Sequence, residues 1–109
     1  MDLSWSSLTT DVADLVSCWR SQRAGRQARR GLDRSDFDQL AQAGFLRVAV
    51  PEDAGGLWRS VGETTRPVCE LLRALATADP SVALVASMHP AVIGFWLARP
   101  DATRRDWAA

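Results

Sequence analysis

Hydrophobic residues recur every three or four positions near the start of the chain, which is the spacing of a helix with one apolar face. They are Leu8, Val12, Leu15, Val16 and Trp19. Thr9 or Thr10 offers the side-chain oxygen that an N-cap before Asp11 requires. The pattern predicts a first helix from about Thr10 into an arginine-rich stretch that Gly31 ends.

A shorter amphipathic segment follows, with Phe37, Leu40 and Ala41 at helical spacing. Asp33 and Asp36 can cap this second helix, and Gly44 can end it. Residues 45–50 then alternate bulky and small side chains without helical period, and the proline after them favours extended backbone. We therefore expect a short extended link, followed by a loop whose paired glycines allow backbone angles that other residues avoid.

A third helix has the clearest apolar stripe, formed by Val68, Leu71, Leu72 and Leu75. Thr64 or Thr65 can serve as its N-cap, which places Pro67 in the first turn, where the missing N–H is harmless. Asp79 and the proline after it end this helix and begin the next.

Residues 82–98 form an almost uninterrupted apolar run, and no residue between Asp79 and Arg99 is charged. A membrane-spanning helix needs roughly 20 apolar residues, but this run contains Ser87, His89, Pro90 and Gly94. We favour a central helix that protein surrounds on every side. The preceding helices each have one apolar stripe and can cover only part of it, so the remaining cover is expected outside this chain.

Pro100 and Asp101 signal a helix start, and residues 103–109 read as the opening turns of a fifth helix without a C-cap. The sequence thus predicts an all-α fold of about four helices plus the start of a fifth, truncated there. With 109 residues, one domain is expected. The first seven residues lack the basic and apolar regions of a signal peptide, which favours a cytoplasmic location.

Acidic and basic residues number 13 each, so net charge gives no reason to expect nucleic acid or an anionic membrane as partner. Five arginines nevertheless crowd one short stretch: Arg20, Arg23, Arg26, Arg29 and Arg30. We interpret them as a solvated helix end, which the helix dipole favours, in preference to a phosphate-binding patch.

Residues suited to catalysis or metal binding are scarce. Cys18 and Cys69 are too few and too far apart for a disulfide framework or a zinc site, and both are expected as buried thiols on apolar helix faces. One histidine, His89, cannot form a metal-binding cluster by itself. The three glutamates are expected in solvent: Glu52, Glu63 and Glu70. Neither a Rossmann nor a phosphate-loop fingerprint occurs.

The order of motifs resembles the N-terminal helical domain of the acyl-CoA dehydrogenase family. The matching segments are Ala43-Gly44-Phe45-Leu46, Val50-Pro51-Glu52-Asp53-Ala54-Gly55-Gly56 and Ala78-Asp79-Pro80-Ser81-Val82-Ala83. The resemblance covers residues 32–109, while residues 1–31 form an N-terminal helix with an arginine-rich end that matches nothing specific. Trp58 departs from the Leu-Gly that usually follows the paired glycines, and this leaves the subfamily open.

The resemblance implies that the complete protein oxidises an acyl-CoA thioester between its α and β carbons with FAD, and that it assembles as a homo-oligomer. The catalytic glutamate and most flavin contacts would lie beyond Ala109, so this chain alone is expected to be inactive and to bind no FAD. No catalytic residue is assigned to it. One wall of the acyl pocket would come from Ser87, Met88, His89 and Val92.

His89 has three interpretations. In flavin-dependent monooxygenases that resemble this fold, a histidine in a similar Ser-x-His setting helps to protonate or stabilise the flavin–oxygen adduct, and His89 would then be catalytic. It could instead line the acyl pocket, or be a core histidine bonded to a carbonyl beside a kink at Pro90. A fourth possibility concerns the whole chain, namely a non-enzymatic helical module that buries its apolar face against a partner.

Overall fold

The computed structural model describes residues 4–96 of the chain, and this part is all-helical. Its elements are α1 (Trp5–Ser21), α2 (Arg23–Ala28), α3 (Arg34–Ala43), α4 (Val61–Ala78) and α5 (Pro80–Trp96), with two short 3-10 helices, η1 (Phe45–Arg47) and η2 (Glu52–Ala54). The predicted all-α class is confirmed. The predicted fifth helix start near Pro100 lies outside the described residues.

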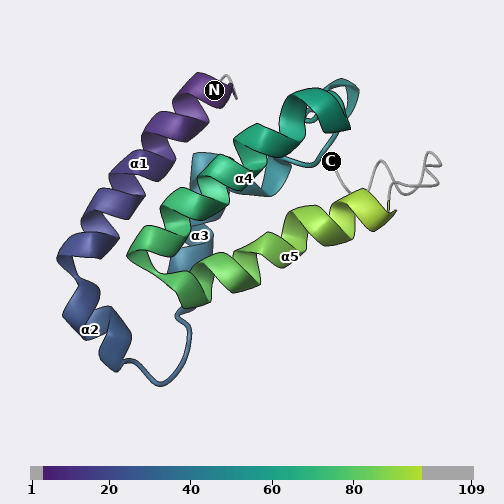
Figure 1. Cartoon of the computed structure of the whole chain (residues 1–109). Helices are drawn as coiled ribbons and strands as arrows, with labels where there is room; N and C mark the ends of the chain where they lie inside the picture. The colour runs from purple at the N-terminus through teal and green to yellow at the C-terminus, as the bar shows by residue number, and fades with distance from the viewer. Residues whose placement is uncertain (1–3, 97–109) are drawn as a thin grey trace.

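Helix α4 lies at the centre of the arrangement, running beside α1 and packing against α5, which follows it after a sharp corner (Figure 1). Helix α3 contacts both α1 and α5. The long helices therefore enclose a core between them, while short α2 extends from the end of α1 towards that corner (Figure 1).

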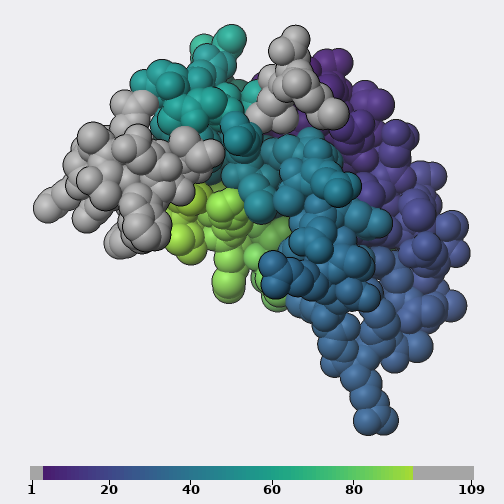
Figure 2. Space-filling model, turned by 180° about the vertical axis from the view of Figure 1, so that it is seen from behind, coloured from purple at the N-terminus to yellow at the C-terminus, as the bar shows by residue number. Residues whose placement is uncertain are grey.

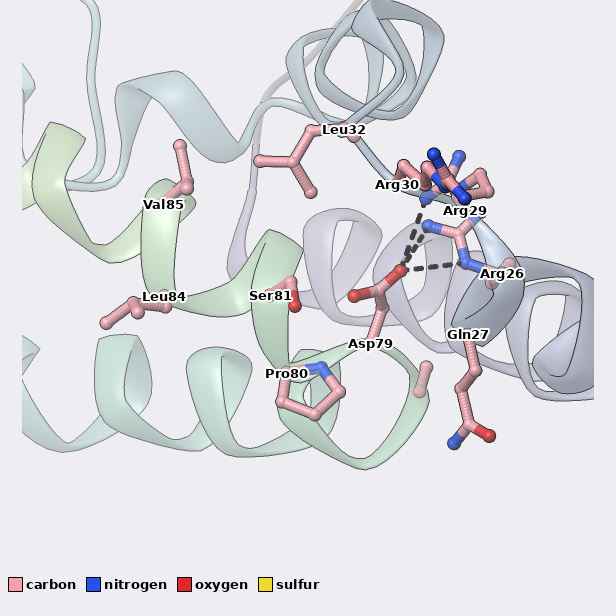
Figure 3. Close-up of a pocket in the computed structure, with 12 residues that line it drawn as sticks. Arg26, Gln27, Arg29, Arg30, Leu32, Asp79, Pro80, Ser81, Leu84 and Val85 are labelled. Atoms are coloured by element: carbon pink, nitrogen blue, oxygen red, sulfur yellow. Dashed lines mark hydrogen bonds and ion pairs between the residues drawn. The ribbon is translucent and has the colours of Figure 1, made fainter.

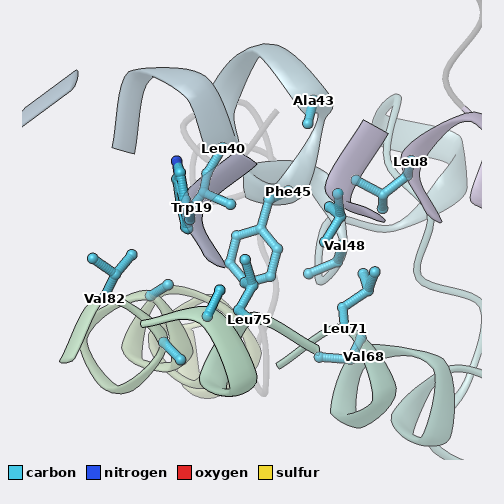
Figure 4. Packing of buried hydrophobic residues seen from close by; sticks show 14 of the residues in the cluster. Leu8, Trp19, Leu40, Ala43, Phe45, Val48, Val68, Leu71, Leu75 and Val82 are labelled. Atoms are coloured by element: carbon cyan, nitrogen blue, oxygen red, sulfur yellow. The ribbon is translucent and has the colours of Figure 1, made fainter. Parts of the chain in front are cut away.

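Side chains from every long helix meet in this core (Figure 4). The largest fully buried ones are Trp19, Phe45, Leu8, Leu40 and Leu75. Fully burying one leucine or phenylalanine stabilises a fold by about 1.5–3 kcal/mol. The apolar stripe predicted for the third helix is confirmed, because Val68, Leu71 and Leu75 are all buried.

Two helices begin earlier than the sequence predicts. Helix α1 starts at Trp5, because the Ser4 hydroxyl accepts a hydrogen bond from the Ser7 backbone N–H at 3.1 Å. Helix α4 starts at Val61, because the Ser60 hydroxyl accepts one from the Glu63 N–H at 3.1 Å. The threonine caps expected for both helices are wrong, since serine hydroxyls further upstream already satisfy the first free N–H groups.

The earlier start of α4 changes the roles of Thr64 and Pro67. The Thr64 hydroxyl is buried and accepts a hydrogen bond from the Arg59 backbone N–H at 3.0 Å, so it fastens the preceding chain to the helix. Pro67 lies inside α4 and not in its first turn. Its ring has no N–H to donate, so one bond of the helix ladder is missing at this position.

The extended link predicted for residues 45–50 is also wrong. Phe45–Arg47 forms the turn η1, and backbone bonds from Val48 to Phe45 and from Val50 to Arg47 continue the tight winding. This winding directs Phe45, Val48 and Val50 into the interior, where each is at most 1% exposed. The proline at position 51 constrains its neighbour's backbone, but burial of three apolar side chains determines the path.

Other local predictions are confirmed. Asp33 caps α3 by accepting a hydrogen bond from the Ser35 N–H at 2.9 Å, and Gly44 ends α3 with a left-handed φ of 97°. The thiols are an exception, because Cys18 and Cys69 are exposed and not buried. Within residues 4–96, none of the helices combines the length and apolar character that crossing a bilayer needs.

Candidate functional site

The residues expected to line an acyl pocket lie on α5, and two of them face outward. Met88 is 62% exposed and Val92 is 57% exposed. Together with Leu84 and Val85 they form an exposed apolar surface, which we call the α5 face, and side chains of α5 reach the molecular surface in Figure 2. Ser87 donates its hydroxyl to the Leu84 carbonyl of its own helix.

The opposite side of α5 is buried through Val82, Ala83 and Ala86. The preceding helices therefore cover only one side of α5, as the sequence predicts. A helix that is apolar on all sides is normally surrounded by protein. The α5 face is therefore an apolar surface that residues 4–96 leave exposed.

His89 is half-buried and bonds to the Leu46 carbonyl, 3.0 Å from its Nε2 atom. A carbonyl oxygen only accepts, so Nε2 carries a proton and donates it. In the neutral ring, Nδ1 then keeps a lone pair. Burial lowers the pKa of His89, which favours this neutral form. The bond links α5 to η1, the contact that the core-histidine interpretation expects, while the roles with substrate or flavin stay predictions.

A second feature contradicts the expected solvated helix end at two of its five arginines, while Arg20, Arg23 and Arg30 are exposed as predicted. Arg26 is only 7% exposed and binds both carboxylate oxygens of Asp36, at 3.0 and 2.9 Å. Its Nε also donates to Asp79 at 3.1 Å. Arg29 donates through Nη2 to Asp36 at 2.8 Å and lies 3.4 Å from Asp79. We call these four residues the Arg–Asp cluster.

Electrostatics within the Arg–Asp cluster favour the charged forms of Asp36 and Arg29. Burial opposes ionisation of Asp36, but hydrogen bonds from Arg26 and Arg29 outweigh this and lower its pKa. The hydrogen bond to Asp36 likewise raises the pKa of Arg29. The ring of Trp19 lies 4.3 Å from the Arg26 guanidinium and adds a cation–π contact. A buried pair of this kind is costly to break, because removing one partner leaves an unpaired buried charge.

Asp79 connects the Arg–Asp cluster to the ends of two helices, α4 and α5. Its Oδ1 accepts from the Val82 N–H at 3.2 Å and thereby caps α5, while its own N–H closes α4 on Leu75. The cluster therefore joins α2, α3 and the corner between α4 and α5. The sequence predicts that corner, but no local pattern shows that Asp36 and two arginines meet there.

A cavity of about 480 Å³ lies beside the cluster (Figure 3). Arg26, Arg29 and Arg30 line one side, and Leu32, Leu84 and Val85 line the other. Figure 3 shows Asp79 and Ser81 between these two sides. The cavity thus combines a cationic wall with an apolar wall.

The segment that carries the family resemblance forms a closed turn. Trp58 donates its backbone N–H to the Val50 carbonyl at 2.9 Å, and Glu52 donates to the Trp58 carbonyl at 3.2 Å. A Cβ on Gly56 would lie 2.0 Å from the Val50 oxygen, so only glycine fits there. The paired glycines therefore have a structural role.

Glu52, Glu63 and Glu70 are exposed, as predicted, and Glu52 pairs with Arg59. In the part of the chain that the structure describes, no three histidine, cysteine or acidic side chains gather in a way that could hold a metal ion. The functional candidates are therefore the α5 face, with His89 beside it, and the cavity at the Arg–Asp cluster.

Comparison of the chain with protein-family models, with curated proteins and with solved structures finds no match. The resemblance to acyl-CoA dehydrogenases thus rests on the sequence motifs, and the function it implies is a proposal.

Proposed function

We propose that this chain is the N-terminal helical domain of an FAD-dependent, acyl-CoA dehydrogenase-like oxidoreductase. The observation that carries the proposal is the α5 face, which is apolar and exposed where the resemblance expects one wall of an acyl pocket. Met88 and Val92 project from it, and no charged residue interrupts α5. A surface of this kind suits the hydrocarbon part of a thioester and apolar contacts with the rest of an enzyme.

In this proposal the chain supplies packing and one apolar wall. Further polypeptide supplies the glutamate that removes the α-proton and the contacts that hold FAD, which accepts the hydride from the β-carbon. The Arg–Asp cluster fixes the start of α5, and the His89 bond to Leu46 fixes its second half. Both contacts keep the α5 face in one position relative to the core.

The test is to express the complete reading frame that contains this sequence, record the flavin absorbance spectrum and measure acyl-CoA-dependent dye reduction. We expect a yellow protein that acyl-CoA bleaches. Met88→Trp should lower kcat/KM for long acyl chains more than for short ones, because the larger ring shortens the pocket. Asp14→Asn, on the exposed side of α1, is the matched control. A colourless protein without this activity would contradict the proposal and favour the interaction module.

His89 supports a second candidate, a flavin-dependent monooxygenase of the same fold. Its neutral ring has an available Nδ1 lone pair, and the Leu46 bond holds the ring in one orientation. Such a group can accept or relay a proton beside a flavin. His89→Ala in the complete protein should then raise the share of hydrogen peroxide released when O2 reoxidises the enzyme. An unchanged share would remove this candidate.

A further inference from the structure

We infer that the cavity beside the Arg–Asp cluster binds a small organic carboxylate with a short hydrocarbon tail. The cavity shares Leu84 and Val85 with the α5 face, but Met88, His89 and Val92, which the proposed acyl pocket uses, do not line it. The inference rests on the charge of one wall, the apolar character of the other and the size of the space between them.

On the cationic wall, Arg26 and Arg29 are paired with Asp36 and Asp79, and the exposed carboxylate of Asp33 also acts on both arginines. Arg30 is the remaining arginine of this wall. Arg30 is exposed and makes neither an ion pair nor a hydrogen bond with any residue in the range 4–96. A ligand carboxylate would supply the ion-pair partner that Arg30 lacks there.

Arg29 also has unused donors. Only its Nη2 contacts the aspartates, and its buried Nε–H has no acceptor within the described part of the chain. Because this Nε is closed to solvent, a ligand in the cavity would meet the exposed part of the Arg29 side chain, which is 27% exposed. A ligand carboxylate beside Arg29 and Arg30 would bring two oxygens to these guanidinium groups, and charge-assisted bonds of this type are strong.

The second wall determines the rest of the ligand. Leu84 is 67% exposed, and Leu32 and Val85 are each 44% exposed, so the cavity offers apolar surface that water now covers. Its volume of about 480 Å³ lies within the range of about 300–1,000 Å³ usual for small-molecule sites. A carboxylate at the arginines with a hydrocarbon tail over Leu32 and Leu84 would use both walls (Figure 3).

We would test this with the 109-residue chain by titrating sodium octanoate and following backbone amide shifts by NMR. Saturable shifts are expected at Arg30, Leu32 and Ser81, all on the cavity wall. Acetate, which lacks the tail, and 1-octanol, which lacks the charge, should each bind at least about tenfold more weakly.

Two variants test whether octanoate binds in this cavity. Arg30→Gln should weaken octanoate binding about tenfold, because it removes the unpaired cation. Arg20→Gln removes an exposed arginine of the same stretch outside the cavity and should leave binding unchanged. Circular dichroism checks that both variants remain folded.

Three results would overturn the inference. If Arg30→Gln bound octanoate as tightly as the native chain, the binding would not depend on the charge of the cavity. If 1-octanol bound as tightly as octanoate, the binding would be adsorption on an apolar surface. If octyl phosphate bound more tightly than octanoate, the cavity would be a phosphate site and not a carboxylate site. None of these results bears on flavin content or acyl-CoA oxidation in the complete protein, so the two proposals fail separately.

Discussion

The two halves of α5 are held in opposite ways. At its start, charged side chains are buried, because Arg26 and Asp36 are 7% and 4% exposed and Asp79 caps the helix. In the second half, apolar side chains face outward at Met88 and Val92, and one hydrogen bond from His89 connects the helix to η1. Both arrangements reverse the usual distribution of polar and apolar residues.

This difference shows which half of α5 can gain contacts from another molecule. Arg26, Asp36 and Asp79 are paired with one another within the chain, so the start of α5 has a fixed position. Residues 4–96 give the outward apolar residues no such cover, and contact with further polypeptide or substrate would remove them from water. The start of α5 is thus fixed by contacts within the chain, whereas its second half exposes apolar side chains.

The strongest way to disrupt the fixed half is Arg26→Met. It leaves Asp36 and Asp79 without their main partner in a buried position, and breaking such a pair costs about 3–5 kcal/mol. Urea unfolding monitored by circular dichroism measures the loss of unfolding free energy. Arg20→Met, at an exposed position of α1, is the control and should change it little. A loss in Arg26→Met no larger than in the control would show that the buried charges do not fix this half.

Gly56→Ala acts on the second half of α5 through the closed turn at residues 50–58, which is bonded to η1 by the Leu57 N–H and the Arg47 carbonyl. The new Cβ would meet the Val50 carbonyl at 2.0 Å and must displace it. Overpacking of this kind costs about 1–3 kcal/mol. Gly62→Ala has nothing within 4 Å and should leave the unfolding free energy unchanged or higher. Equal stability of the two variants in urea would contradict this role of the turn.

Acid should affect the two halves in separate pH windows. The pKa of His89 is lower in the folded chain than in the unfolded chain, so the folded chain binds fewer protons there. The contribution of His89 to the free energy of unfolding is therefore lost as the pH falls below the ordinary pKa of 6.5. The lowered pKa of Asp36 means that its contribution is present above the ordinary value of 3.8 and lost as pH falls through the lower folded value.

Amide hydrogen exchange along α5 across this pH range would separate the two windows. Protection should decrease first in the second half and only at lower pH around Val82. His89→Gln should remove the decrease in protection in the second half of α5. Asp36→Asn should remove the decrease around Val82 at lower pH. Simultaneous loss of both halves in the native chain would show that they do not respond separately.

Met88→Gln should have the smallest effect on stability. The side chain is 62% exposed, and surface substitutions usually change the unfolding free energy by less than about 0.5 kcal/mol. Self-association, measured by sedimentation velocity, should nevertheless decrease, because the substitution makes the α5 face more polar. Leu75→Ala, in the core, is the opposite case and should cost about 2–5 kcal/mol. A large stability loss in Met88→Gln would mean that the residue contributes to the core.

Much of the fold follows from apolar spacing, since it identifies the long helices and the partial cover of α5. Caps were less predictable, because Ser4 and Ser60 stand further upstream than the threonines that local rules favour. The turn at residues 45–50 was missed for a different reason. Its winding depends on burial of Phe45 and Val48 against distant helices, and the local sequence carries no helical period there.

The candidate site divides in the same way. The α5 face and His89 could be recognised from the sequence, because a long uncharged run with one histidine is a local pattern. The Arg–Asp cluster could not, because Arg26 and Asp79 are 53 positions apart and arginines near a helix end are normally solvated. Only the packing of α2 against the corner brings them together.

The carboxylate of Asp79 links the short helix α2 to α5. One of its oxygens closes the beginning of α5 and the other holds a guanidinium from α2. Proteolytic removal of the first thirty residues would therefore leave this carboxylate without its cation and loosen the corner between α4 and α5. The orientation of α5 in this way depends on an arginine of α2.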